Sequence, residues 1–267
     1  MKKVLLIITS LFGLALTINA SKFVNLTPMP KHITVAEGAY KLPESYSINA
    51  KHLPDSICVE AEKFVQTILK TTGCKARITS KKKADIEMSL DTNLPNEGYK
   101  LSVTKKKIQI SASTTSGFFY AFQTIKKIMP AHVMAGLNPE QAQAIIPTFQ
   151  TDKRPTIPCV EIYDEPRFWY RGFMLDCGRH FFTVDEIKHI LDGMAMYKMN
   201  YFHWHLTEDQ GWRFEVKKYP RLTSIGSVAS DCRMNDMEKG YYWLGKPYGP
   251  FYYTQEDCRE IVEYARS

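Results

Sequence analysis

Cysteine motifs that hold metals or exchange electrons are missing from this sequence. Its six cysteines include no Cys-x-x-Cys pair and no zinc-finger spacing, which argues against zinc-finger and thioredoxin-like proteins. Their spacing indicates no disulfide pairing, and a chain of 267 residues can bury a core without cross-links. We expect Cys177 to be a small buried side chain. The six positions are Cys58, Cys74, Cys159, Cys177, Cys232 and Cys258.

Long apolar runs are also scarce, and the main one, from Val4 to Leu16, follows Lys2 and Lys3. This run is too short for a stable membrane span, and a cleavage site could follow Ala20. We therefore predict a signal peptide over residues 1–20 and export to the periplasm or the medium, with an uncleaved anchor as the alternative. No cysteine follows the run, so there is no lipid-anchor signal.

Basic residues interleaved with aromatic ones, the pattern of many nucleic-acid-binding surfaces, are lacking as well. The formal net charge is +7, but the lysines occur in short clusters such as Lys81–Lys83 and Lys105–Lys107. Such clusters are typical of solvated turns at strand edges. We therefore expect no nucleic-acid partner.

The sequence predicts a small α+β domain over residues 21–150. Residues 60–69 and 114–129 have apolar side chains at helical spacing, and Gly73 follows the first of these segments. Apolar residues alternate over 99–103 and 108–112, on either side of the Lys105–Lys107 cluster, which predicts an antiparallel hairpin. No convergent set of catalytic side chains occurs here, so we interpret this domain as structural support.

A second domain, over residues 151–267, is predicted around a strand–helix–strand unit. The strands are 170–176 and 200–206, and the intervening helix starts at a capping box in which Thr183 is the N-cap and Glu186 follows three residues later. Short connections predict a right-handed βαβ unit with parallel strands. Residues 151–167 are expected to connect the domains and lead into an entry strand.

Polar residues follow both strands, at the edge where parallel sheets and barrels bind ligands. Three hypotheses remain open from the residues alone. Sugar hydrolysis or sugar binding is favoured by a set of charged and aromatic side chains. A metal-dependent hydrolase is suggested by His203 and His205, which share one face of a strand. The third hypothesis is a non-catalytic module. The set that favours sugars is Arg179, Glu208, Asp209, Trp204, Trp212, Trp243, Tyr241 and Tyr242.

Two segments carry a resemblance that favours the first hypothesis. RGFMLDCGRHFF, residues 171–182, and NYFHWHLTEDQGWR, residues 200–213, resemble the family 20 glycoside hydrolases, the β-N-acetylhexosaminidases. EGYKL, residues 97–101, and SGFFYAFQT, residues 116–124, resemble the family's non-catalytic N-terminal domain. The resemblance implies the start of a TIM (β/α)8 barrel behind the α+β domain, truncated after about two βα units.

The resemblance also implies a reaction, the removal of terminal β-linked GlcNAc or GalNAc from glycans with retention. The sugar's own 2-acetamido oxygen is the nucleophile in that reaction. By position, Arg179 would hold the sugar hydroxyls, with a structural ion pair to Asp176 as the alternative. Glu208 would be a supporting carboxylate, usually Asp in the family, and no cofactor or metal is implied. The residues expected to shape the substrate site are His205, Asp209 and Trp212.

The sequence departs from the family at its catalytic pair. An adjacent Asp-Glu pair on a later strand supplies the family's general acid, whereas here such pairs occur at Asp164-Glu165 and Asp185-Glu186, away from the predicted strand ends. We therefore expect this chain to be an N-terminal portion that is inactive alone. The alternative is a non-catalytic glycan-binding module.

Overall fold

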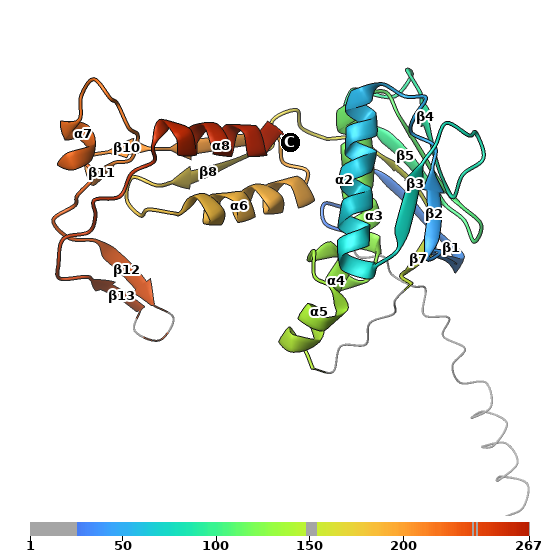
Figure 1. Cartoon of the computed structure of the whole chain (residues 1–267), viewed down its shortest axis with the longest axis horizontal. Coiled ribbons are helices and arrows are strands. Elements are labelled where there is room, and N and C mark those ends of the chain that lie inside the picture. Colours follow the sequence, from blue (N-terminus) through green and yellow to red (C-terminus); the bar gives the residue numbers. More distant parts are fainter. Residues whose placement is uncertain (1–25, 148–153, 237, 239, 267) are drawn as a thin grey trace, which may run out of the picture. The chain divides into compact units, whose positions relative to one another are not determined.

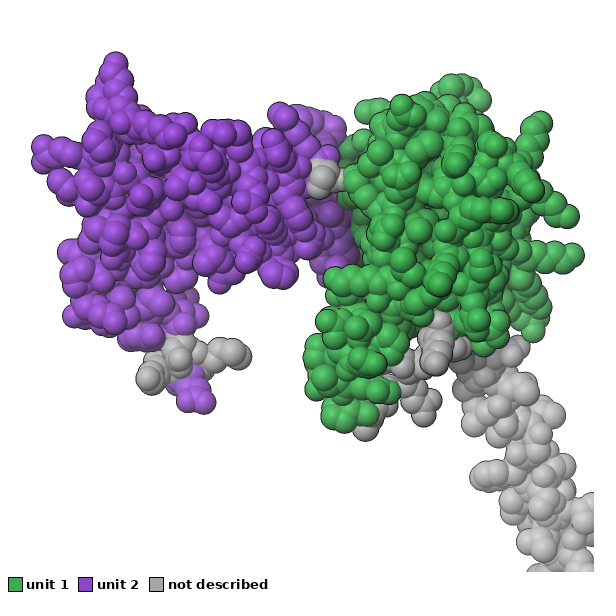
Figure 2. Space-filling model, in the orientation of Figure 1, with its two compact units in different colours: residues 1–166 green, residues 167–267 purple. Residues whose placement is uncertain are grey.

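The computed structural model describes residues 26–147, 154–236, 238 and 240–266, so the predicted signal peptide lies outside the described residues. The chain divides into two compact units, residues 1–166 and 167–267, coloured separately in Figure 2. Within the described ranges, no helix is long and apolar enough to cross a membrane.

Unit 1 is built on a seven-stranded mixed sheet. Its strand order is β1-β7-β5-β6-β4-β2-β3, in which β1, β7, β5 and β6 pair antiparallel and the remaining neighbours pair parallel. The predicted hairpin is confirmed, because β5 and β6 pair with their apolar residues buried. The strands are β1 (His32–Lys41), β2 (Ser45–Ile48), β3 (Lys75–Ile78), β4 (Ile86–Leu90), β5 (Tyr99–Val103), β6 (Ile108–Ala112) and β7 (Thr156–Asp164).

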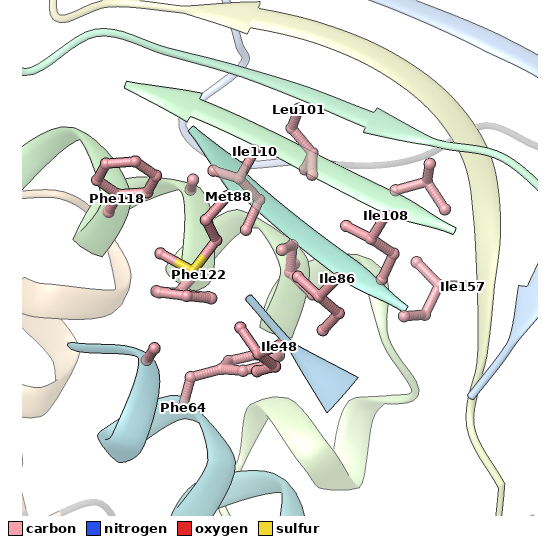
Figure 3. Close-up of a cluster of buried hydrophobic side chains, with 14 of the residues drawn as sticks. Ile48, Phe64, Ile86, Met88, Leu101, Ile108, Ile110, Phe118, Phe122 and Ile157 are labelled. Atoms are coloured by element: carbon pink, nitrogen blue, oxygen red, sulfur yellow. The ribbon is translucent and has the colours of Figure 1, made fainter. Parts of the chain in front are cut away.

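Two helices, α2 (Asp55–Thr72) and α3 (Thr115–Ile128), pack against this sheet (Figure 1). Figure 3 shows Phe64 of α2 and Phe118 of α3 pointing toward strand residues such as Met88. Helix α2 is longer than predicted at both ends, and Gly73, which was expected just beyond it, caps it in the left-handed conformation (φ +76°). Two short helices, α4 (Ala131–Met134) and α5 (Pro139–Ile145), were not predicted.

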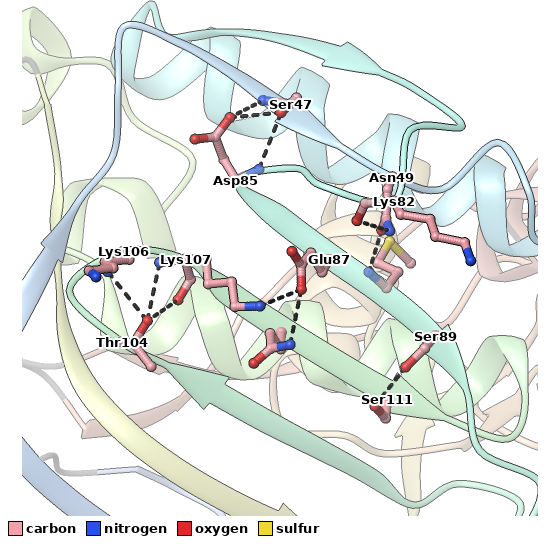
Figure 4. A network of polar contacts seen from close by, with 12 residues as sticks. Ser47, Asn49, Lys82, Asp85, Glu87, Ser89, Thr104, Lys106, Lys107 and Ser111 are labelled. Carbon is pink, nitrogen blue, oxygen red and sulfur yellow. Dashed lines mark hydrogen bonds and ion pairs between the residues drawn. The ribbon is translucent and has the colours of Figure 1, made fainter.

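Polar contacts also join neighbouring strands of unit 1 (Figure 4). The Asp85 carboxylate, just before β4, accepts hydrogen bonds from the backbone N–H and hydroxyl of Ser47 in β2, at 2.8 and 2.7 Å. Lys107 pairs with Glu87 of β4 at 2.7 Å. These contacts lie within the sheet and its turns, which agrees with a structural role for unit 1.

Strand β7 corrects the predicted connector between the domains. We expected residues 151–167 to lead into the second domain, but β7 pairs with both β1 and β5 inside the first sheet. Ile157, Val160 and Ile162 of β7 are buried in the core of unit 1, so the burial of these side chains joins the strand to that unit. The two units therefore divide after Pro166 rather than at residue 150.

Unit 2 contains the predicted strand–helix–strand unit. Strands β8 (Gly172–Asp176) and β9 (Tyr201–His205) are parallel, and helix α6 (Val184–Met196) connects them. Both hydrogen bonds of the predicted capping box form, between Thr183 and Glu186. The buried residues of this unit come from β8, α6, the segment before α8 and α8 itself (Gln255–Arg266). They are Leu175, Cys177, Ile187, Leu191, Met194, Tyr253 and Ile261.

The segment between β9 and α8 contains several short elements. Two short strands, β10 (Thr207–Glu208) and β11 (Gly211–Trp212), form a tight antiparallel pair directly after β9. One helical turn follows, α7 (Arg221–Ser224). A second hairpin, of β12 (Arg233–Asp236) and β13 (Gly240–Trp243), lies between α7 and α8.

Candidate active site

Four predicted polar residues meet where β8 and β9 end. Asp176 and His205 are register partners at the last positions of the two strands. The guanidinium of Arg179 pairs with the Asp176 carboxylate and, through Nη2, with Glu208 Oε2 at 3.1 Å. His205 Nε2 lies 3.1 Å from the same Glu208 oxygen. Arg179, Asp176, Glu208 and His205 therefore form one network, which we call the strand-end network.

The backbone explains why Arg179 and Glu208 come so close. A Cβ atom at Gly178 would lie 2.6 Å from the Cβ of Glu208, nearer than side chains approach, so only glycine fits between the turn after β8 and strand β10. The backbone N–H of Arg179 also donates to Asp176 Oδ1 at 3.1 Å, which fixes the turn. Residues 177–179, Cys-Gly-Arg, thus bring the Arg179 guanidinium to the Glu208 carboxylate as well as to that of Asp176.

The surroundings favour the ionised forms of Glu208, Asp176 and Arg179. The backbone N–H of Asp209, then His205 and then the charge of Arg179 lower the pKa of Glu208. Burial acts to raise the pKa of Asp176, but hydrogen bonds from Arg179 outweigh it, so that this pKa is lowered too. In turn, the hydrogen bond and charge of Asp176 raise the pKa of Arg179. The network therefore presents one permanent cation held between two carboxylates.

The Arg179 side chain is 57% exposed, although it makes two ion pairs. A guanidinium carries five N–H donors in a fixed planar arrangement, more than two carboxylate contacts require. The ion pair with Asp176, the alternative considered from the sequence, is therefore present without excluding a ligand. The geometry suits recognition of neighbouring hydroxyl groups.

The pKa of Glu208 is expected to rise toward its ordinary value when His205 is replaced by alanine, because one hydrogen bond to the charged form is lost. In the unmodified protein the pair with Arg179 is present at neutral pH and is lost as the pH falls through the lowered pKa. A carbon-detected NMR titration of the Glu208 carboxyl measures this. His203→Ala is the matched control, and equal titration curves for all three proteins would contradict the expectation.

Two other predicted site residues lie beside the network. Asp209 is exposed, and its backbone N–H donates to Glu208 Oε1 at 3.3 Å. Trp212 is directed elsewhere, because its Nε1 donates to the backbone oxygen of Phe214 at 2.6 Å. Asp209 thus orients Glu208, whereas Trp212 contributes to the fold of the β10–β11 pair.

The two histidines of the His-x-His pair have different surroundings. His203 is exposed and its ring centroid lies 6.4 Å from that of His205, which is engaged with Glu208. In the parts of the chain that the structure describes, no three His, Cys, Asp or Glu side chains gather to hold a metal ion.

Cys177 is fully buried as expected, and its sulfur accepts a hydrogen bond from Trp204 Nε1 at 3.2 Å.

Arg213 ends the segment 200–213 that carries the family resemblance, and the sequence indicated no role for it. It is 0% exposed, and the described structure shows its guanidinium bonded to backbone oxygens rather than to a carboxylate. It donates to four carbonyls at 2.7 to 3.0 Å, those of Cys177, Gly178, Ser227 and Phe251.

This guanidinium joins three separate segments of the chain, one of which leads directly into Arg179 of the strand-end network. Cys177 and Gly178 form the turn that immediately precedes Arg179, while Ser227 and Phe251 flank the β12–β13 hairpin in the chain. A Cβ at Gly211 would lie 2.3 Å from Arg213 Nη2, so glycine is required there. The Gly-Trp-Arg sequence was the available signal, but a spacing alone does not reveal that an arginine is buried.

Comparisons with known proteins identify the family of the chain. Residues 24–165 match the model "Glycosyl hydrolase family 20, domain 2", and residues 168–267 match "Glycosyl hydrolase family 20, catalytic domain". A beta-hexosaminidase of Porphyromonas gingivalis is 38% identical over 257 residues, which are 91% of this chain and 29% of that protein. One from Vibrio furnissii is 33% identical, over 90% of this chain and 35% of that protein.

Solved structures give the same result. An exo β-N-acetylglucosaminidase of Vibrio harveyi in complex with N-acetylglucosamine superimposes with a TM-score of 0.71 at 29% identity, covering 90% of this chain and 34% of that one. An N-acetyl-β-hexosaminidase of Streptomyces plicatus gives 0.73 at 27% identity, covering 90% and 43%. The chain thus spans about a third of the length of the curated relatives named above. With both family models matched over nearly all of its length, the chain belongs to glycoside hydrolase family 20.

Proposed function

We propose that this chain supplies the sugar-binding part of a β-N-acetylhexosaminidase, which removes terminal GlcNAc or GalNAc residues from glycans. The observation that carries the proposal is the strand-end network, in which an exposed guanidinium is oriented by Asp176 and Glu208. Arg179 would donate to hydroxyls of the terminal sugar, and Glu208 and His205 would keep it in place. Family membership and the GlcNAc bound to the Vibrio harveyi enzyme support this substrate class.

The reaction we propose for the whole enzyme is substrate-assisted and retaining. The 2-acetamido oxygen of the sugar attacks the anomeric carbon, while a protein carboxylic acid protonates the leaving oxygen and a neighbouring Asp steadies the acetamido group. Arg179 contributes by fixing the ring so that the acetamido group can reach the anomeric carbon. The fold that would complete this site is a TIM barrel, of which β8, α6 and β9 would be the beginning.

The described residues do not offer the Asp-Glu pair for this acid step, because both adjacent pairs have structural roles. Asp164 is buried at the end of β7 and accepts a hydrogen bond from Tyr99, at 3.2 Å, while Glu165 pairs with Lys31. Asp185 and Glu186 lie in the first turn of α6, where Glu186 completes the capping box. We therefore propose that these 267 residues bind the sugar without turning it over.

Replacing Arg179 with alanine is expected to weaken GlcNAc binding by about 10- to 100-fold, because hydrogen bonds to a charged group contribute about 1.5–3 kcal/mol. Isothermal titration calorimetry of the purified chain measures this. Arg221→Ala, at an exposed arginine of α7, is the control and should leave affinity unchanged. Equal GlcNAc affinity in the Arg179 variant would overturn the assignment of the sugar site.

A chromogenic β-GlcNAc substrate separates the enzyme from the alternative, a glycan-binding module. We expect binding without turnover from these residues. Turnover that depends on Arg179 would refute the inactivity proposal, whereas full-length protein that binds GlcNAc but never hydrolyses the substrate would favour the binding module. The predicted signal peptide leads us to propose export as well, which fractionation of the native host would test.

A further inference from the structure

The backbone on both sides of Arg179 is held by groups from far along the sequence. Before Arg179, the Arg213 guanidinium bonds two backbone oxygens of the turn. At and after Arg179, further contacts come from two stretches, residues 227–232 and 244–251. These stretches flank the β12–β13 hairpin in the chain, and we call them the hairpin base. The turn that carries Arg179 is therefore supported from both of its ends.

Tyr248 of the hairpin base contacts the two residues that follow Arg179. Its phenol oxygen accepts a hydrogen bond from the backbone N–H of Phe181 at 3.1 Å. Its ring stacks on the His180 ring, with the two centroids 5.8 Å apart and the two planes 25° from parallel. Burial raises the pKa of Tyr248, so the phenol is uncharged at neutral pH and acts by its position rather than by a charge.

A weaker contact from the hairpin base lies at Arg179 itself. The buried thiol of Cys232 donates to the Arg179 backbone oxygen at 3.6 Å. A thiol is a weak donor, whereas the bond between the phenol oxygen of Tyr248 and a backbone N–H is an ordinary hydrogen bond. Tyr248 is therefore the main support of the chain after Arg179.

Tyr248 is itself fixed by the two stretches of the hairpin base. Its backbone N–H and oxygen exchange two hydrogen bonds with those of Ala229, each 2.9 Å long. A Cβ atom at Gly249 would lie 2.4 Å from the Ser227 backbone oxygen, so a side chain there would push the two stretches apart. The support is thus built from backbone pairing and does not depend on a bound sugar.

The position of the turn decides where the Arg179 guanidinium lies. Its two ion-pair partners, Asp176 and Glu208, belong to different strands, and the side chain bridges them from the backbone position that the turn gives it. Hydrogen bonds weaken steeply when their geometry is distorted. A rotation of the backbone after Arg179 would therefore loosen both pairs and turn the remaining N–H donors away from a ligand.

We propose that Tyr248 is a positioning residue, which holds the backbone after Arg179 so that the guanidinium stays between its two carboxylates and faces the terminal sugar. The sugar part of this inference rests on the proposed function, whereas the effect of Tyr248 on Arg179 can be measured without a sugar. Loss of the phenol oxygen should act on Arg179 and, through it, on Glu208 and on sugar affinity.

Tyr248→Phe removes the phenol oxygen but keeps the ring that stacks on His180. In a carbon-detected NMR titration, the pKa of Glu208 should rise toward its ordinary value, because the charge of Arg179 is one of the causes that lower it. A residue that only stabilised the fold would leave this titration unchanged in the folded protein. Tyr252→Phe, at an exposed tyrosine nearby in the chain, is the matched control. Thermal unfolding followed by circular dichroism checks that both variants fold.

The affinity for GlcNAc, measured by isothermal titration calorimetry, is expected to fall by about 3- to 10-fold in the Tyr248 variant, the equivalent of about one hydrogen bond. Combined with Arg179→Ala, the same substitution should change affinity by less than about 2-fold further, because Tyr248 acts on binding only through the arginine.

The outcomes separate this proposal from the sugar site itself. A Glu208 titration that Tyr248→Phe leaves unchanged, or a loss of affinity that simply adds to that of Arg179→Ala, would overturn the positioning role. A folded chain that binds no GlcNAc, but whose Glu208 pKa rises in the Tyr248 variant, would refute the proposed function and support the positioning role.

Discussion

Arg213→Met is expected to lower the free energy of unfolding of unit 2 by at least about 3 kcal/mol, because buried acceptors left without a donor cost about 1–3 kcal/mol each. Four carbonyl oxygens share this guanidinium, and methionine provides no donor for any of them. Single domains are stable by only about 5–15 kcal/mol, so this loss is a large fraction of the total. The turn that carries Arg179 should lose its position at the same time.

Tryptophan fluorescence during urea unfolding measures this effect in unit 2 alone, since all four tryptophans lie there. Arg221→Met is the control, because Arg221 is exposed and a surface substitution changes stability by about 0.5 kcal/mol or less. Arg213→Lys should lie between the two, as an ammonium group cannot reach four carbonyls in the geometry of a guanidinium. A Met variant as stable as the parent would show that the carbonyl cluster does not depend on this side chain. The tryptophans are Trp169, Trp204, Trp212 and Trp243.

Phe118→Ala is expected to cost unit 1 about 3–5 kcal/mol, the usual range for removing a buried phenylalanine ring from a core. Phe118 is 0% exposed on α3 and belongs to the cluster between the helices and the sheet (Figure 3). The cost includes both the lost burial and the cavity that remains, because the surrounding strands cannot collapse into it.

Far-UV circular dichroism during urea unfolding follows the helices of both units, so the transition that tryptophan fluorescence does not show belongs to unit 1. Phe119→Ala is the matched control, because the neighbouring ring is only half-buried and should cost clearly less. The tryptophan transition of unit 2 should remain in place for the Phe118 variant. A similar cost for both phenylalanines would contradict the burial seen in the structure.

The elements that depend on neighbours in sequence were predictable. The alternation over 99–103 and 108–112 predicted β5 and β6, and the capping box at Thr183 predicted the start of α6. Leu69 is an exception, because it ends the segment with apolar side chains at helical spacing, over residues 60–69, and yet is 37% exposed. A residue at the edge of the apolar stripe of a helix can belong to the buried or to the exposed face. Only the packing of the helix against the sheet decides between the two faces.

In the candidate site, too, some features were predictable from the sequence and others depended on contacts between distant residues. The residues after β8 and β9 were predicted to converge, because parallel strands place their carboxyl ends at one edge. Their pairing was not predictable, since the approach of Glu208 to Arg179 depends on the missing side chain of Gly178 across a gap of many residues. Arg213 was missed for a related reason, because arginine is rarely buried and its carbonyl partners come from three distant segments.

By itself, the sequence determined the local elements, the strand–helix–strand order and the family, because hydrophobic periodicity, capping residues and motifs are properties of neighbouring positions. Only the tertiary structure decided that β7 joins the first sheet, that Arg213 holds the turn before Arg179, and that Cys232, at the base of the β12–β13 hairpin, bonds the Arg179 backbone oxygen. Each of these depends on contacts between residues distant in the chain, and such contacts form only when the whole unit packs its core and satisfies its buried backbone oxygens.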